Sequence, residues 1–189
     1  MKSILIIYQK NSQYTKILAQ SILEGVNIEN INGDVYSIEY IVFHVDLLVK
    51  YDAVIFGFST YFGSFSSEMK LFTDTTYPIW CRKLWNNKIA AAYTHSSSIS
   101  GDKLSALIQM FVFAQQHGMI WVGLDIPCCY QNNSGILLNS IGSWVGLMAQ
   151  TPSKIWGRES IQRDIETAKY FGSRIAKITK SLTINCIVK

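Results

Sequence analysis

The sequence has little of what marks secreted, metal-binding or membrane-spanning proteins. Only four of its 189 residues are cysteines, and no CxxC pair occurs. Cys128 and Cys129 are adjacent, which suits neither a zinc site nor an ordinary disulfide, so we expect reduced structural thiols and no metal. No apolar run is long enough to span a bilayer, and the first, at 4–8, is too short for the core of a signal peptide. We therefore expect a cytoplasmic protein with no segment inserted in a membrane.

Charged residues are also scarce, at 16% of the chain, and the formal net charge is +4. The basic residues are dispersed, with mild clusters only at 82–83 and at 169–180, where the spacing is typical of a solvated helix face. No basic stripe is interleaved with aromatic residues, so we expect no nucleic-acid partner. A basic balance does suit a protein that receives anionic cofactors.

Apolar residues are abundant, at 49% of a chain the size of one globular domain. No repeat, low-complexity segment or change of composition divides the chain, which predicts one domain over 1–189. Short apolar runs predict buried strands, and amphipathic stretches predict helices. The strands are expected at 4–8, 35–38, 53–58, 89–93 and 119–122, and the helices at 15–25, 66–76, 102–117 and 160–181.

Two glycines carry helix-stop signals. Gly25 lies near the expected end of the first helix, and Gly118 follows the helix at 102–117 as a C′ glycine. In that helix the apolar residues recur at helical spacing, which predicts one buried face. That face would consist of Leu104, Leu107, Ile108 and Phe111.

Strands that alternate with amphipathic helices predict a doubly wound parallel sheet covered on both faces. Residues 123–158 contain Gly, Ser and Asn and look irregular, and a loop of this length is usually functional. Ligands of such sheets bind beyond the carboxyl ends of the strands. The loops of interest therefore follow Tyr8, Phe58, Tyr93 and Val122.

Three of these loops have a composition that suits a ligand. Loop 9–16 opens a helix, where free N–H groups bind phosphate, and loop 59–66 places two aromatics beside a glycine, which suits a flat ring. Loop 94–101 offers backbone donors and hydroxyls for a polar ring edge. Each loop also has an ordinary alternative. Loop 9–16 could be only an N-cap and turn, loop 59–66 a loop that packs under the neighbouring helix, and loop 94–101 a solvated serine-rich loop.

The sequence also resembles a known family. The blocks YDAVIFG at 51–57, STYFGS at 59–64 and MKLFTD at 69–74, with QHGM at 116–119, carry the resemblance. They are similar to the NAD(P)H:quinone oxidoreductases of the Trp-repressor-binding-protein (WrbA) type, within the flavodoxin-like NADPH-dependent FMN reductases.

The resemblance implies a flavodoxin-like three-layer sandwich with a five-stranded parallel sheet of order 2-1-3-4-5. It also implies an FMN cofactor held by three loops and a two-electron ping-pong reaction. NADH or NADPH would be the electron donor and a quinone or similar small molecule the acceptor. The protein would be a homodimer or homotetramer.

Matching positions assign residues to three parts of the FMN site and to the space for the acceptor. The phosphate loop would hold Lys10, Ser12, Tyr14 and Thr15; the isoalloxazine would lie against Thr60, Tyr61, Phe62, Gly63 and Ser64; its polar edge would meet Thr94, His95, Ser96, Ser97 and Gly101. His117 and Tyr61 would orient the acceptor or donate a proton. From the residues alone, His117 is equally well a cation at a helix C-terminus.

Two positions depart from the family pattern: Ser59 stands where a proline is usual, and Gln13 where the phosphate loop has a glycine. Gln13 adopts a positive φ less readily than glycine, which predicts weak FMN binding. Two other functions stay open. One is a flavodoxin-type electron carrier, against which the basic net charge counts, and the other is a flavin-free binding protein on the same fold.

Overall fold

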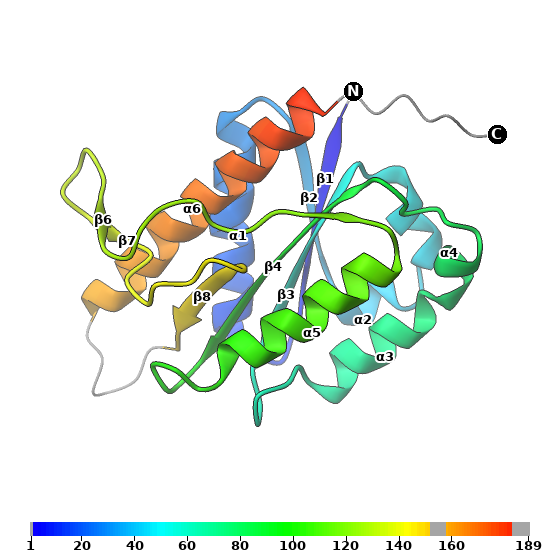
Figure 1. The fold of residues 1–189 in the computed structure, drawn as a ribbon, viewed down its shortest axis with the longest axis horizontal. Coiled ribbons are helices and arrows are strands. Elements are labelled where there is room, and N and C mark those ends of the chain that lie inside the picture. Colours follow the sequence, from blue (N-terminus) through cyan, green and yellow to red (C-terminus); the bar gives the residue numbers. More distant parts are fainter. Residues whose placement is uncertain (1, 152–157, 183–189) are drawn as a thin grey trace.

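A six-stranded parallel sheet lies between two layers of helices in the computed structural model, which describes residues 2–151 and 158–182 (Figure 1). Five strands follow the order β2-β1-β3-β4-β5, and β8 also pairs with β4. The predicted α/β architecture and strand order are confirmed. The strands of this sheet are β1 (Ser3–Tyr8), β2 (Asn32–Ser37), β3 (Ala53–Ser59), β4 (Ile89–Ser96), β5 (Ile120–Trp121) and β8 (Leu147–Gln150).

Two separate segments fill the fifth position of the sheet. The short β5 pairs with Ile89 and Ala90 at the beginning of β4, and β8 pairs with the end of β4, from Tyr93 to Ser96. The segment between them carries an antiparallel hairpin, β6 (Tyr130–Gln131) with β7 (Leu137–Leu138). The segment predicted to be irregular over 123–158 is irregular for most of 123–151, but it holds the short strands β6, β7 and β8, because the chain returns to pair the remaining backbone groups of β4. Positions 152–157 of that prediction lie outside the described residues.

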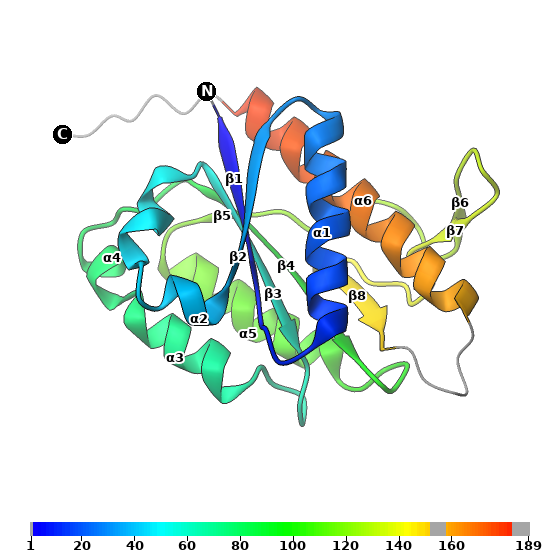
Figure 2. The ribbon, with the colours of Figure 1, turned by 180° about the vertical axis from the view of Figure 1, so that it is seen from behind.

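Helices α1 (Gln13–Ile28) and α6 (Arg158–Ser181) cover one face of the sheet, and the remaining helices lie on the other face (Figures 1 and 2). Alternation along the strands divides the core accordingly: Ile4 and Ile6 face α1 and α6, whereas Leu5 and Ile7 face the other layer. The other helices are α2 (Ile38–Ile41), a 3₁₀ turn (Val45–Lys50), α3 (Ser67–Thr75), α4 (Tyr77–Cys81) and α5 (Lys103–Gln116). Within the described ranges no helix is long and apolar enough to cross a membrane.

The sequence predicted that the first helix ends near Gly25, but the structure differs. Helix α1 continues to Ile28, and Gly25 lies where α1 meets α6. A Cβ on Gly25 would lie 1.9 Å from the carbonyl oxygen of Lys169, and one on Gly172 would lie 2.1 Å from that of Ile22. The two glycines therefore allow the backbones of α1 and α6 to approach closely.

The buried face of α5 differs from the predicted one. Leu104 and Ile108 are 49% and 45% exposed, although Leu107 is buried as expected. The face toward the sheet is lined by Ala106, Leu107, Met110 and Ala114. Ala106 and Ala114 let α5 pack close to the alanines of β4, and Leu104 and Ile108 lie on the exposed side of the helix. Gly118 ends α5 as predicted, with φ +69°.

Candidate functional site

The loops after β1, β3 and β4 lie together at the carboxyl edge of the sheet, the lower edge in Figure 1. Backbone hydrogen bonds hold them there. Gln9 N–H donates to the Gly57 oxygen at 3.1 Å, Thr60 N–H to the His95 oxygen at 2.9 Å, and Thr151 N–H to the Ser96 oxygen at 2.9 Å. The three loops that the sequence singled out therefore form one region.

The side chain of His95 lies at the centre of a group of hydroxyls, which we call the His95 cluster. Its Nε2 lies 3.1 Å from Ser12 Oγ, 2.7 Å from Thr15 Oγ1 and 3.0 Å from Ser59 Oγ. Its Nδ1 lies 2.7 Å from Thr151 Oγ1. The sequence assigned His95 to the polar edge of the ring; in the structure its side chain turns toward α1, because β4 runs on to Ser96 and its side chains alternate between the two faces of the sheet.

The His95 cluster holds more hydrogen-bond donors than its own members can use. One ring nitrogen offers one lone pair or one N–H, so it satisfies no more than one of the three hydroxyls on Nε2. The Ser12 hydroxyl makes no capping bond to α1, and the first turn of α1 has no acidic residue. Surplus hydroxyl donors at a positive helix end suit the oxygens of a phosphate group.

Burial governs the ionisation of the His95 cluster. Burial, with a smaller contribution from the charge on Lys103, lowers the pKa of His95 to about 4. Lys103 is itself buried, and its Nζ donates to the oxygens of Ser98 and Ile99 at 2.7 and 2.8 Å. Burial lowers the pKa of Lys103 to about 8. Sequence reasoning missed Lys103, although a lysine in the first turn of a helix opposes the helix dipole and so needs another purpose.

Tyr14 and Lys10 contribute less to this region than the sequence predicted. The Tyr14 hydroxyl donates to Asp164 Oδ2 at 2.9 Å, so only the backbone N–H of Tyr14 remains for a phosphate. Asp164 also accepts from the Gln150 N–H at 2.8 Å, and burial raises its pKa to about 6. Lys10 is exposed, and its backbone N–H donates to Glu39.

Tyr61 to Ser64 form a tight two-residue turn at the tip of the loop after β3, which we call the 61–64 turn. The N–H of Tyr61 and the N–H of Ser64 each donate to the carbonyl oxygen of the other at 2.9 Å. Phe62 and Gly63 both have positive φ, +48° and +71°. Gln109 on α5 fixes the turn through the Ser64 hydroxyl and the Gly63 oxygen.

The 61–64 turn exposes its aromatic residues. Phe62 is fully exposed and Tyr61 is 53% exposed, in spite of the steric cost of a positive φ at a bulky residue. A Cβ on Gly63 would meet nothing closer than Asp102 Cβ at 3.4 Å. The glycine therefore serves the turn conformation, and the space beside Gly63 is not crowded by other atoms of the chain.

Several residues predicted at the ring are committed to the chain itself. The hydroxyls of Thr60 and Thr94 are buried and lie 2.7 Å apart. Ser96 Oγ donates to the Ser98 oxygen at 3.1 Å. A Cβ on Gly101 would lie 2.2 Å from Ser96 Oγ, so Gly101 packs directly against that hydroxyl. Among the predicted polar-edge residues, Ser97 is exposed, which leaves its side chain accessible to a ligand.

His117 lies at the opposite edge of the sheet from the three loops. It follows the end of α5, whereas the loop after β4 precedes the start of α5. The ring packs against Trp85 and Phe113, with centroids 4.7 and 4.8 Å apart, and Nε2 lies 3.0 Å from Thr76 Oγ1. Burial lowers the pKa of His117 to about 4. His117 lines a hollow beside α3 and α5 that extends to Gln109 and Phe65, and Tyr61 is not among the residues that line it.

These shifted groups predict how stability depends on pH. Between about pH 6 and 4 the folded chain keeps His95 and His117 neutral and Asp164 protonated, whereas the unfolded chain has the reverse. Unfolding then takes up two protons and releases one, so the unfolding free energy should fall by about 1.4 kcal/mol per pH unit as the pH drops. Urea unfolding across this range measures the slope.

His117→Gln provides the control for this pH dependence. It removes one of the two protons taken up, so the slope between about pH 6 and 4 should become nearly flat. A slope that His117→Gln leaves unchanged would show that other groups cause the acid sensitivity.

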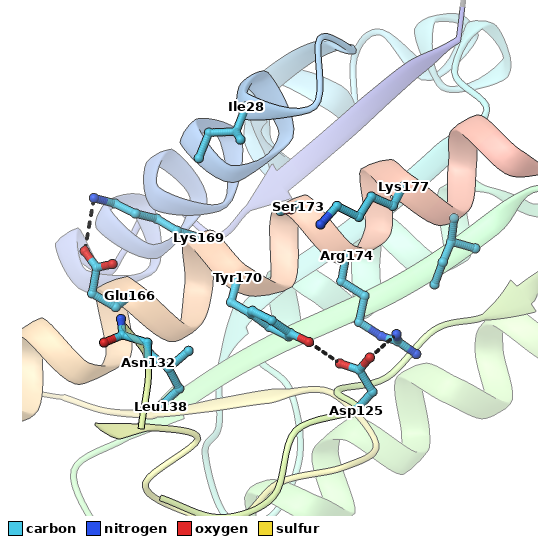
Figure 3. A pocket seen from close by; sticks show the side chains of 11 residues that line it. Ile28, Asp125, Asn132, Leu138, Glu166, Lys169, Tyr170, Ser173, Arg174 and Lys177 are labelled. Carbon is cyan, nitrogen blue, oxygen red and sulfur yellow. Dashed lines mark hydrogen bonds and ion pairs between the residues drawn. The ribbon is translucent and has the colours of Figure 1, made fainter. Parts of the chain in front are cut away.

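A hollow of about 500 Å³ lies away from these loops, along α6 and beside the hairpin of β6 and β7 (Figure 3). Asp125 accepts from the Tyr170 hydroxyl at 2.9 Å and forms an ion pair with Arg174. The other two cations of the hollow also have carboxylate partners: Lys169 pairs with Glu24 and Glu166, and Lys177 pairs with Glu29. The Asp125 contacts fasten the segment after β5 to α6, whereas the lysine pairs join α6 to α1 or lie within α6.

Comparison with known proteins places the chain among flavin-dependent relatives. The family described as NADPH-dependent FMN reductase matches residues 44–125. Flavodoxin FldP of Pseudomonas aeruginosa is 32% identical over 187 residues, which cover 96% of this chain and 99% of that protein. An NAD(P)H dehydrogenase (quinone) of Sinorhizobium fredii is 30% identical over 73% of this chain and 68% of its own length. The corresponding Archaeoglobus fulgidus protein is 33% identical over 71% of this chain and 63% of its own length.

Solved structures extend the likeness over the whole fold. The flavodoxin, WrbA-like protein from Agrobacterium tumefaciens has a TM-score of 0.74 and 25% identity, covering 97% of this chain and all of that one. Oxidised Flavodoxin 1 from Bacillus cereus has a TM-score of 0.63 at 19% identity, covering 96% of this chain and all of that one. The second likeness concerns the fold alone.

Proposed function

The chain belongs to the flavodoxin-like family of WrbA-type quinone oxidoreductases and NADPH-dependent FMN reductases, and from this premise we propose that it is an FMN-dependent oxidoreductase. In this proposal NADH or NADPH gives two electrons to FMN, and a quinone or similar small acceptor takes them in a second step. The observation that carries it is the His95 cluster, which provides surplus hydroxyl donors at the start of α1.

The FMN phosphate would be held by the hydroxyls of Ser12, Thr15 and Ser59 and by the first N–H groups of α1. The two departures from the family pattern are compatible with this assignment. Gln13 begins α1 with a helical backbone, so no positive φ is required of it. Ser59 adds a hydroxyl to the cluster, and its N–H donates to Gln9 Oε1 at 3.1 Å, a bond that proline could not make.

The isoalloxazine would lie between the 61–64 turn and the loop at 96–101. When bound, FMN supplies the hydride and electron chemistry, and the protein positions and shields it. Phe62 offers an exposed aromatic face on a turn that Gln109 holds rigid. We assign to Tyr61, half exposed beside it, the orientation of the acceptor.

Flavodoxin FldP gives a specific reason to keep electron carriage as a second candidate, because its match covers nearly the whole of both chains. Spectra of the purified protein, recorded with and without added FMN, test whether it is a flavoprotein. Oxidation of NADH and NADPH, with and without a quinone, then separates the candidates. The enzyme should turn over with a quinone, whereas a carrier should bind FMN without such turnover. A protein that binds no FMN would contradict both.

Assembly into a homodimer or homotetramer is also part of this proposal. It is supported by apolar side chains exposed on α4 and α5, namely Trp80, Leu104, Ile108 and Val112. Sedimentation of the purified protein measures the state directly, and a monomer at all concentrations would contradict it.

Phe62→Asn should change stability and binding in opposite directions. Asparagine tolerates a positive φ at this place in a two-residue turn, so the unfolding free energy of the apoprotein should rise by about 1 kcal/mol. Loss of the aromatic face should weaken FMN binding about tenfold. Thermal unfolding and an FMN titration measure the two effects.

Phe43→Asn is the matched control, because Phe43 is also a highly exposed phenylalanine but lies far along the chain from the turn. It should leave FMN affinity unchanged. If Phe62→Asn binds FMN as tightly as the parent, the ring does not contact Phe62.

A further inference from the structure

Cys128 and Cys129 are exposed and lie close enough to act together. Their sulfur atoms are 3.6 Å apart. They occupy the two central positions of a turn in which the Tyr130 N–H donates to the Pro127 oxygen at 3.3 Å. Cys129 has φ +57°, a conformation that usually calls for glycine or asparagine at this position.

The surroundings hold this turn in place. The Cys129 N–H donates to the Asn139 oxygen at 3.4 Å. Asn139 is buried, and its Nδ2 donates to the oxygens of Ile126 and Ser143 at 3.0 and 3.1 Å. One asparagine therefore links both sides of the segment that carries the two thiols, so their proximity is built into the fold.

We propose that Cys128 and Cys129 form a reversible redox-modification site, which closes to a vicinal disulfide by exchange with a small disulfide such as oxidised glutathione. The thiolate of one cysteine attacks a sulfur of the small disulfide, and one glutathione leaves. The thiolate of the other cysteine then attacks the resulting mixed disulfide at the protein sulfur, and the second glutathione leaves. The two thiols of the protein are oxidised, and their two protons pass to the two glutathione thiolates.

The order of attack follows from the hydrogen bonds. The Cys128 thiol donates a hydrogen bond to the Ser140 oxygen at 3.7 Å. Hydrogen bonding to Cys129 raises the pKa of Cys128. The Ser140 oxygen keeps the proton on the Cys128 sulfur, and only a thiolate attacks. We assign the first attack to Cys129 and ring closure to Cys128.

Geometry makes such a disulfide easy to reduce. Adjacent Cα atoms are about 3.8 Å apart, below the range of about 4.4–6.8 Å in ordinary disulfides. The bond is therefore strained, and strained, exposed disulfides are the labile and regulatory ones. The sulfurs must approach from 3.6 Å to bonding distance, which side-chain rotation in an exposed turn can supply.

The test uses the full chain with Cys186→Ser, which removes the cysteine outside the described residues. After exposure to oxidised glutathione and alkylation of free thiols, peptide masses are measured. The peptide with Cys128 and Cys129 should lose two hydrogen atoms and regain them with excess reduced glutathione. Cys81, exposed and without an adjacent cysteine, should carry only a glutathione adduct.

Cys128→Ser and Cys129→Ser keep one thiol each and cannot close the ring. Cys129→Ser should react more slowly than Cys128→Ser, and each should retain a stable glutathione adduct. Thermal unfolding checks that both variants fold. The proposal is overturned if the parent carries two adducts at this turn, if either cysteine pairs with Cys81, or if the turn stays reduced while Cys81 reacts.

Discussion

Thr15→Val is expected to weaken FMN binding by about 1.5–3 kcal/mol, which is one to two orders of magnitude in Kd. The change keeps the shape of the buried side chain and removes one hydroxyl of the His95 cluster, 2.7 Å from Nε2 of His95. Ser12 and Ser59 remain within reach of that nitrogen, so the apoprotein should lose little stability. An FMN titration of the variant and the parent measures the difference.

Thr179→Val is the matched control for this prediction. Thr179 is also buried on a helix, and its hydroxyl donates to the Ile175 oxygen at 2.7 Å, but it lies near the end of α6. The control should keep the FMN affinity of the parent. If Thr15→Val also keeps it, the phosphate does not lie against the His95 cluster.

Gly25→Val should destabilise the protein by about 3 kcal/mol or more, a large part of the stability of a small domain. The new Cβ would lie 1.9 Å from the Lys169 oxygen and 2.9 Å from the Ser173 nitrogen, both in the backbone of α6. The backbone of a helix cannot rotate aside as a side chain can, so α1 and α6 must separate and lose buried contacts on that face of the sheet. Urea unfolding measures the loss.

Gln20→Val provides the control, because Gln20 is exposed on the same helix. It tests the cost of a β-branched residue in α1 without the clash and should lower stability by less than about 1 kcal/mol. Equal effects of the two substitutions would show that helix propensity, and not contact with α6, accounts for the result.

The position of the three loops could be predicted, because the apolar runs and helix caps that fix it are local features of the sequence. The run from Ala53 to Ser59 is buried throughout, which an apolar run of this length indicates for a central parallel strand. Ser66 caps α3 by accepting from the Met69 N–H, as the sequence favours. Alternation of such strands with helices then predicts which loops share one edge of the sheet.

The roles of individual side chains at that edge could not be predicted in the same way. The expected strand ended at Tyr93, but β4 continues to Ser96. Because successive side chains of a strand point to opposite faces of the sheet, Thr94 faces α5 and His95 faces α1. There the imidazole of His95 contacts the hydroxyls of Ser12 and Thr15. A difference of a few residues in strand length thus decides which part of the region His95 belongs to.

The sequence by itself determined the parallel sheet and the three loops at its carboxyl edge, because hydrophobic period and capping act between near neighbours in the chain. The order of the strands followed from the family resemblance. Only the tertiary structure decided that Gly25 is a helix contact, that β8 completes the edge of β4, and that His95 joins the hydroxyls at the start of α1. Each of these depends on a segment distant in sequence. Local pattern carries no information about which distant segment arrives there, whereas packing and the pairing of buried polar groups do.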